Sequence, residues 1–229
     1  EGDALIVRDV FNEDLVEKIK GYLATIGRSS LPQYQAIVEG CANTHRVVNW
    51  DKRSYTKGCF HQFSFLPWNQ DVFGFFDIAK PIYQLKNLLG DLPRNSFIDG
   101  NYQFECVPRI SFQFYPCGKG AMNRHRDPVD EHQLTVPLML LGKKGIDYTS
   151  GGCFAEDSQG KQILLDDLMN PGDVLFFNAA ITHGVKIIDP NVNSDWLDFK
   201  GRWSAVFAIN KLHNSQHIGN AEDLSEVNV

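Results

Sequence analysis

Hydrophobic and polar positions follow a helical period near the N-terminus of the chain. Apolar residues recur every three or four positions between residues 15 and 26, which predicts a helix that Asn12 caps and Gly27 ends. A second helix is expected over residues 70–89, and Pro81 should kink or divide it near Lys80. Its apolar stripe is predicted to be Phe73, Phe76, Leu85, Leu88 and Leu89.

The rest of the chain carries patterns typical of short strands. Residues 4–7, 44–50 and 58–66 are expected as strands, with residues 28–44 as a loop. From residue 96 onward, Gly, Pro and Asn turn signals separate eight β-like runs: 102–107, 109–115, 133–141, 152–156, 162–165, 173–178, 183–188 and 203–209. This spacing predicts a mainly β fold with supporting α, namely a double-stranded β-helix (a cupin-like jelly roll) with N-terminal helices. We expect a single domain over residues 1–229, with residues 1–100 as support, 101–210 as the jelly-roll core and 211–229 as a loose tail.

Composition narrows the class of protein without identifying it. The 229 residues carry a net charge of -6, which argues against nucleic acid or anionic lipid as a partner. Five widely spaced cysteines without a CxxC pair predict reduced thiols in a cytoplasmic protein. No apolar run is long enough to suggest a membrane span.

Three residues of the second half form a candidate metal site. His125 and Asp127 are two positions apart, so on an extended strand their side chains point the same way, and Pro128 favours extended backbone at Asp127. His183 follows a later apolar strand and would return to the same end of the barrel. Two histidines and one carboxylate on one face of an octahedral ion leave three positions open, enough for an α-keto acid and O₂, as in non-haem iron(II) oxygenases.

The remaining histidines have weaker contexts. His213 and His217 are four apart, a spacing that a helix could turn into a metal pair, although a solvated tail explains them better. His45, His61 and His132 have no ligand-like neighbours in the sequence.

Two further motifs flank this triad. Tyr115-Pro-Cys-Gly118 precedes the HxD motif, and Arg202-Trp-Ser204 lies on the last predicted strand, after His183. In this order the motifs resemble those of the Fe(II)- and 2-oxoglutarate-dependent dioxygenase superfamily, most closely its prolyl-hydroxylase-like branch, over residues 109–209. The resemblance implies that the triad binds Fe(II).

The same resemblance implies a co-substrate site. Arg202 would pair with the distal carboxylate of 2-oxoglutarate, Ser204 would hydrogen-bond the same group, and the Tyr115 hydroxyl would contact the co-substrate. A planar guanidinium suits a carboxylate, and Arg202 would be costly to bury without an anion. Gln113 shares the face of Tyr115 and could contact co-substrate or substrate, or serve as a structural amide. Thr135 is the polar residue on the strand after HxD that could support the carboxylate.

We therefore expect a dioxygenase that uses Fe(II), 2-oxoglutarate and O₂ to hydroxylate a C–H bond of a small-molecule substrate, with release of succinate and CO₂. Two alternatives stay open: a protein side-chain (prolyl-type) hydroxylase, and a non-catalytic metal-binding module of the cupin type. Desaturation, epimerisation or ring closure would use the same site. Aromatic residues of the first hundred could line the substrate pocket or pack in the core: Tyr34, Trp50, Tyr55, Phe60 and Trp68.

Overall fold

The computed structural model describes residues 4–48, 51–54, 56–99, 105–130, 132–212 and 221–225. Two helices lie in these ranges, α1 (Glu13–Gly27) and α2 (Phe75–Leu89). The strands are β1 (Ala4–Val7), β2 (Asn43–Val47), β3 (Gly58–Phe65), β4 (Cys106–Pro116), β5 (Ala121–Arg126), β6 (Thr135–Leu140), β7 (Gly152–Glu156), β8 (Gln162–Leu164), β9 (Val174–Asn178), β10 (His183–Lys186), β11 (Gly201–Lys211) and β12 (Glu222–Asp223).

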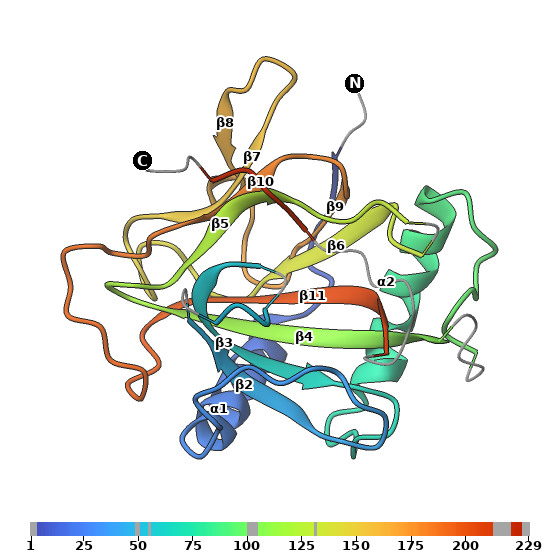
Figure 1. The fold of residues 1–229 in the computed structure, drawn as a ribbon, viewed down its shortest axis with the longest axis horizontal. Coiled ribbons are helices and arrows are strands. Elements are labelled where there is room, and N and C mark those ends of the chain that lie inside the picture. The colour runs from blue at the N-terminus through green and yellow to red at the C-terminus, as the bar shows by residue number, and fades with distance from the viewer. Residues whose placement is uncertain are drawn as a thin grey trace.

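The strands form one curled antiparallel sheet that folds over on itself (Figure 1). Its larger half runs in the order β1-β9-β6-β11-β4-β3, with β2 beside β3, and its smaller half runs β5-β10-β7-β8, with β12 beside β5. The pairing of β3 with β5 joins the two halves. The longest ladder joins β4 and β11, from Cys106 opposite Lys211 to Pro116 opposite Gly201. The predicted jelly-roll core is confirmed.

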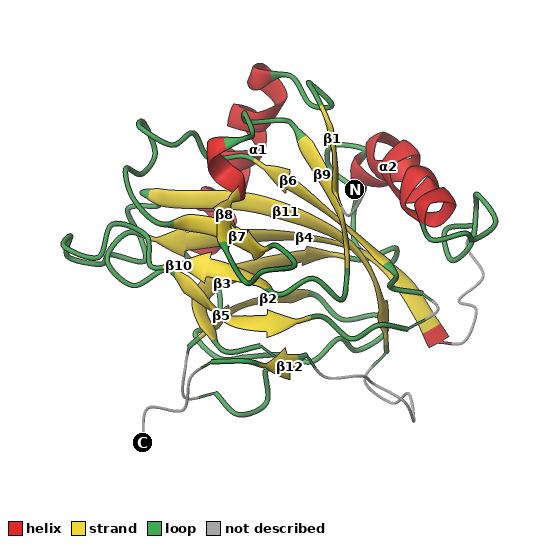
Figure 2. Cartoon of the chain, turned by 90° about the horizontal axis from the view of Figure 1, so that it is seen from above, coloured by secondary structure: helices red, strands yellow, loops and turns green. Residues whose placement is uncertain are grey.

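The larger half of the sheet is buried on both faces. Both helices lie along one side of it (Figure 2), where their apolar residues pack with Phe112, Phe114 and Trp203. A second apolar cluster fills the space between the two halves of the sheet and includes Tyr115 and Phe177. Because side chains alternate along a strand, the face of β4 that looks between the halves carries a polar series, Arg109, Ser111 and Gln113, followed by Tyr115.

The first predicted helix is confirmed, and the second begins later than predicted. Asn12 caps α1, since its Oδ1 accepts a hydrogen bond from Leu15 N at 2.9 Å. The helix α2 begins at Phe75, because the Asp71 carboxylate accepts hydrogen bonds from the backbone N–H groups of Phe75 (2.5 Å) and Phe76 (3.0 Å). The true helix start is therefore set by a carboxylate cap.

Two details of α2 bear on its prediction. The helix is not divided at Pro81 and continues as one element, with Ile82 and Tyr83 buried directly after the proline. Leu88 and Leu89 are exposed at 57% and 46%, so they are not part of the buried stripe. The residues of α2 that are buried are Phe75, Ala79, Ile82, Tyr83, Lys86 and Asn87.

The predicted strands of the core are largely present, with three differences. The runs 102–107 and 109–115 were expected as separate strands, but β4 is continuous from Cys106, and residues 102–104 lie outside the described ranges. The strand β5, which carries His125, was not among the predicted runs. The tail was expected to be loose, yet β12 pairs with β5 and places Asp223 opposite His125. Among the described residues, no helix is long and apolar enough to cross a membrane.

Candidate active site

Two neighbouring strands of the smaller half-sheet bring the predicted metal ligands together. His125 on β5 lies directly opposite His183 on β10 in the strand register, and Asp127 follows the end of β5. The Asp127 carboxylate lies 3.7 Å from His125 Nε2 and 3.6 Å from His183 Nε2. One ligand atom from each of the three residues lies within 4.8 Å of the others. The three side chains are thus arranged to share one ion.

Backbone carbonyls fix how both imidazoles are presented. His125 Nδ1 lies 2.8 Å from the carbonyl oxygen of Asn123, and His183 Nδ1 lies 2.8 Å from that of Ile181. In each pair Nδ1–H donates to the carbonyl, so Nε2 is left without a proton and faces Asp127. This is the arrangement that metal-binding histidines require.

Burial and neighbouring charges set the protonation of the triad. Burial lowers the pKa of His183, which favours its neutral, metal-binding form. Burial alone would raise the pKa of Asp127, but the nearby imidazoles of His125 and His183 and the Arg109 guanidinium outweigh it and hold the pKa below its ordinary value. At neutral pH the site therefore offers a carboxylate, and the donor set fits a divalent transition metal.

The triad opens onto a cavity between the halves of the sheet. The cavity has an empty volume of about 570 Å³, part of it open to solvent, and Tyr115, Gln113 and Arg202 also line it. Arg202 on β11 lies opposite Tyr115 on β4, and its guanidinium lies 5.5 Å from the centre of the Tyr115 ring. The Tyr115 hydroxyl donates to Gln113 Oε1 at 2.8 Å. The structure thus brings three of the four predicted co-substrate residues to the cavity of the metal site, whereas Ser204 is not among the lining residues.

Arg202 pairs with the Asp166 carboxylate of the same chain, and the sequence did not predict this partner. The guanidinium is fully buried and donates through Nε and Nη2 to the two oxygens of the Asp166 carboxylate, at 2.7 and 2.9 Å. Nη1 donates to Ser204 Oγ at 2.9 Å. Asp166 also accepts hydrogen bonds from the Tyr148 hydroxyl (2.6 Å) and the Cys153 N–H (3.1 Å). Burial would raise the pKa of Asp166, but the Arg202 charge more than offsets this and holds it below its ordinary value.

The position of Thr135 differs from the sequence-based expectation. The residues of β6 that line the cavity are Val136 and Leu138, so the alternating side chain of Thr135 points to the opposite face of the strand. Tyr148 and Asp166 are the polar groups that support Arg202 instead. His213 and His217 lie outside the described residues, so their predicted lack of a role stays a prediction.

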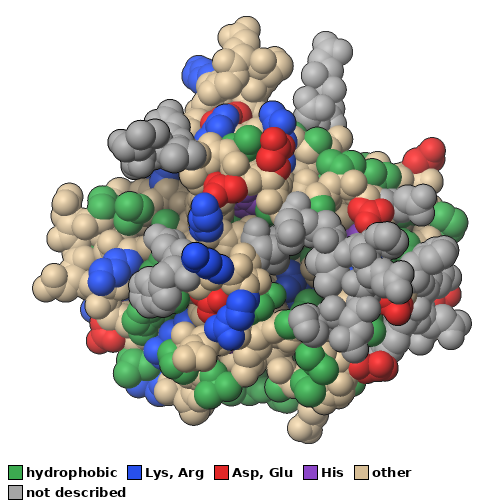
Figure 3. Space-filling model, in the orientation of Figure 1, with side chains coloured by type: hydrophobic (Ala, Val, Ile, Leu, Met, Phe, Trp, Pro, Cys, Tyr) green, Lys and Arg blue, Asp and Glu red, His purple; other side chains and the backbone are tan. Residues whose placement is uncertain are grey.

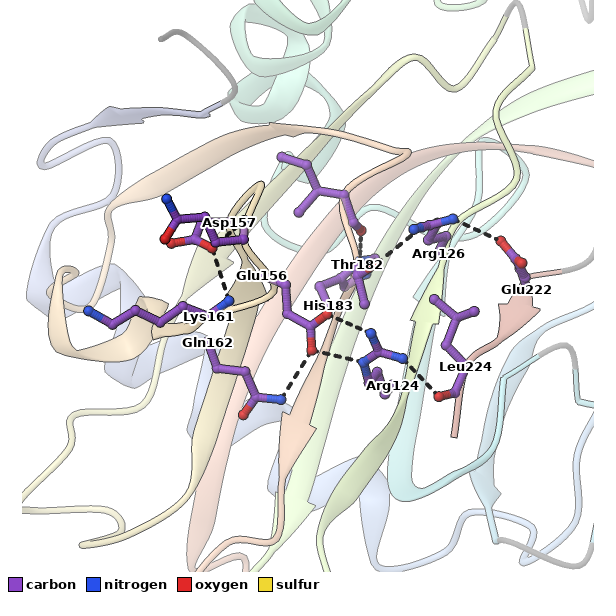
Figure 4. Close-up of polar contacts among 12 residues, drawn as sticks. Arg124, Arg126, Glu156, Asp157, Lys161, Gln162, Thr182, His183, Glu222 and Leu224 are labelled. Atoms are coloured by element: carbon purple, nitrogen blue, oxygen red, sulfur yellow. Dashed lines mark hydrogen bonds and ion pairs between the residues drawn. The ribbon is translucent and has the colours of Figure 1, made fainter. Parts of the chain in front are cut away.

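Charged side chains hold the outer edge of the metal-binding strands (Figure 4). Arg124 donates to both carboxylate oxygens of Glu156 (2.8 and 2.7 Å) and to the backbone carbonyl of Leu224 (3.0 Å). Arg126 donates to Thr182 Oγ1 at 3.1 Å. These contacts tie the C-terminal segment and β7 to β5. Basic and acidic groups are interspersed on this face of the molecule, without a large area of one sign (Figure 3).

No protein-family model and no curated protein sequence match the chain, but solved structures do. A prolyl-4-hydroxylase from Pseudomonas putida has a TM-score of 0.54 at 11% identity, covering 91% of this chain and 92% of that one. A prolyl hydroxylase from Trichoplax adhaerens, in complex with a hypoxia inducible factor peptide fragment, has a TM-score of 0.52 at 13% identity (coverage 90% and 83%). AviO1 from Streptomyces viridochromogenes has a TM-score of 0.53 at 14% identity (coverage 95% and 93%).

These similarities define the class of fold. The chain has the fold of the prolyl hydroxylases, as the order of its motifs predicted. At identities this low, the likeness concerns the fold, and the chemistry has to be argued from the site itself.

Proposed function

We propose that this protein is an iron(II)- and 2-oxoglutarate-dependent oxygenase that hydroxylates a C–H bond of a small molecule. The observation that carries the proposal is that His125, Asp127, His183 and Arg202 line one cavity. Two histidines and one carboxylate are the donor set of non-haem iron(II) oxygenases, and the prolyl-hydroxylase fold supports the same class.

Different residues of the cavity would bind the metal and keep water out of the site. Iron(II), 2-oxoglutarate and O₂ would supply the oxidising chemistry when bound. Asp127 and the unprotonated Nε2 atoms of the two histidines would hold the metal. Val136, Leu138 and Phe177 line the same cavity and would limit the access of water to it.

Arg202 would contribute hydrogen bonds more than net charge. A guanidinium has five N–H donors, and Asp166 and Ser204 use three of them, so one hydrogen on Nη1 and one on Nη2 remain for a carboxylate. Because Asp166 already neutralises the guanidinium, the Tyr115 hydroxyl gains importance as a further contact. We expect Tyr115→Phe to weaken 2-oxoglutarate binding about tenfold, the worth of one hydrogen bond.

The proposal is tested by measuring metal and co-substrate affinity before activity. Mn(II) binding, followed by electron paramagnetic resonance, should be saturable in the wild type and lost in Asp127→Ala. An Asp99→Ala variant is the matched control, because Asp99 is exposed on the surface. Calorimetric titration with 2-oxoglutarate should then give a heat of binding only when the metal is present. Wild-type Mn(II) affinity in Asp127→Ala would contradict the assignment of the triad.

The choice of substrate class is tested by succinate release. A panel of small metabolites should stimulate it, because the ligand residues are buried, with His125 exposed at 1% and His183 at 7%. Stimulation by peptides alone would favour the side-chain hydroxylase, in line with the peptide complex of the Trichoplax adhaerens structure. Mn(II) binding without any 2-oxoglutarate binding would favour the non-catalytic module.

A further inference from the structure

A second arginine lines the same cavity, and it forms no ion pair with a described residue, although its charge acts on Asp127. Arg109 on β4 is exposed at only 4% and lies on the same face of the strand as Gln113 and Tyr115. Its Nε has no hydrogen-bond partner, and its guanidinium forms no ion pair with any residue in the described ranges. A buried cation without an ion pair is costly, and the Asp127 carboxylate that its charge acts on would be engaged by the metal, so the position of Arg109 is best explained by an anionic ligand.

Arg109 lies at the boundary of two cavities. It lines the cavity of the metal triad, and it also lines an adjoining cavity with an empty volume of about 570 Å³, part of it open to solvent. Polar residues from β2, β3 and β11 surround this adjoining cavity, among them Asn43, His45, Gln62 and Asn210. A ligand bound there would reach from Arg109 toward the triad.

The adjoining cavity contains further polar atoms without partners. Asn43 Oδ1, Asn210 Oδ1 and both ring nitrogens of His45 are buried, and none has a hydrogen-bond partner among the described residues. Burial and the Arg109 charge lower the pKa of His45 to about 4, so its imidazole is neutral at physiological pH and offers one donor and one acceptor. Buried polar atoms normally find partners, so this set suits a ligand with hydroxyl or amino groups.

We propose that Arg109 binds the carboxylate of the substrate, and that the substrate is a small carboxylic acid with hydroxyl or amino groups that bond to Asn43, His45 and Asn210. A planar guanidinium forks onto a planar carboxylate, and a single arginine matches a single negative charge. This inference rests on the proposed function, because it takes the occupant of the cavity to be the molecule that is oxidised.

Arg109 and Arg202 enter the cavity from backbone positions that lie far apart in the sheet. In the ladder of β4 and β11, Arg202 lies opposite Tyr115 and Arg109 lies opposite Ala208. Arg109 lies six positions before Tyr115 on the extended strand β4, which places their backbones roughly 20 Å apart at about 3.3 Å per residue. Because of this separation, we assign Arg202 to the co-substrate and Arg109 to the substrate.

The test measures ligand binding by nuclear magnetic resonance and does not need turnover. The probes are the L-α-amino acids, a set of sugar acids and the primary amide of each compound, screened against protein loaded with Zn(II) and 2-oxoglutarate. Saturation transfer should detect at least one acid and not its amide. The signal should vanish in Arg109→Gln, weaken in Arg109→Lys, and persist in Arg94→Gln, an exposed control. Replacing Zn(II) by Mn(II) should broaden the bound acid, because the ligand then lies near the metal.

Several results would overturn the assignment. Equal binding of acids and amides, binding of no acid at all, or binding of phosphate esters in place of acids would each refute a carboxylate site at Arg109. Loss of 2-oxoglutarate affinity in Arg109→Gln would assign this arginine to the co-substrate instead. Failure of the wild type to bind Mn(II) and 2-oxoglutarate would refute the proposed function, while saturation transfer would still report on Arg109.

Discussion

Replacing Asp166 with Asn should destabilise the protein strongly, because it leaves the Arg202 guanidinium buried without its counter-charge. Both side chains are fully buried, and two hydrogen bonds of 2.7 and 2.9 Å join them. Removing one partner of a buried ion pair costs about 3–5 kcal/mol. Removing the hydrogen bond that Tyr148 donates to the same carboxylate at 2.6 Å should cost about 2 kcal/mol, since it ends on a charged group. The free energy of unfolding should therefore fall further in Asp166→Asn than in Tyr148→Phe.

Urea unfolding followed by tryptophan fluorescence measures this order, because Trp203 lies on β11 directly after Arg202. Asp99→Asn is the control and should stay within about 0.5 kcal/mol of the wild type. The variant Asp166→Asn should also be stabilised more by added 2-oxoglutarate than the wild type, since Arg202 is then an uncompensated cation. A loss below about 1 kcal/mol in Asp166→Asn, or an equal loss in Tyr148→Phe, would refute the charge pairing.

Three further predictions concern stability. His61 is fully buried, and burial lowers its pKa to about 3. Below about pH 6.5 the unfolded state therefore takes up a proton at His61 that the folded state does not. The free energy of unfolding should fall by about 1.4 kcal/mol for each pH unit toward acid. Urea unfolding measured between pH 7 and 4 gives the free energy of unfolding as a function of pH. In His61→Phe this dependence should be weaker by the contribution of one proton, and an unchanged dependence would contradict the prediction. Gly201 has a φ of +149°, and a Cβ at this position would lie 2.1 Å from the Tyr115 carbonyl oxygen. Gly201→Ala should therefore lower the free energy of unfolding by more than about 1 kcal/mol. An unchanged melting temperature would refute the clash. Arg109→Met removes a buried charge that forms no ion pair and should raise the melting temperature by about 2–4 °C per kcal/mol gained. A lower melting temperature would show that the attraction between Arg109 and Asp127 outweighs the cost of burying the guanidinium.

Local sequence patterns predicted the structure correctly where the residues that determine it lie within a few positions of one another. The strand β7 occupies Gly152–Glu156 as predicted, because turn signals bound it on both sides. His125 and Asp127 converge because their spacing of two residues matches the period of extended backbone. The start of α2 was missed, since the Asp71 carboxylate caps the helix from outside the apolar pattern.

The electrostatic state of the two arginines could not be predicted in the same way. Asp166 lies in a short 3₁₀ turn, 36 residues before Arg202, and no local pattern links the two. The sequence does contain a pattern that predicts the inward direction of Arg109. On β4 it alternates with apolar residues in step with Gln113, so one face of a strand buried on both sides had to be polar and directed inward.

The difference in charge pairing between Arg202 and Arg109 suggests how the cavity would bind two different carboxylic acids at different positions. Asp166 neutralises Arg202 through an ion pair, whereas Arg109 forms no ion pair with a described residue of the triad cavity. A carboxylate that enters without a metal-chelating group is therefore attracted most strongly to Arg109. Under the proposed function, a keto acid would gain a further interaction where the triad would hold its metal, and the remaining donors of Arg202 would bind its far end by hydrogen bonds. Co-substrate and substrate can thus both be carboxylic acids and still bind at different ends of one cavity.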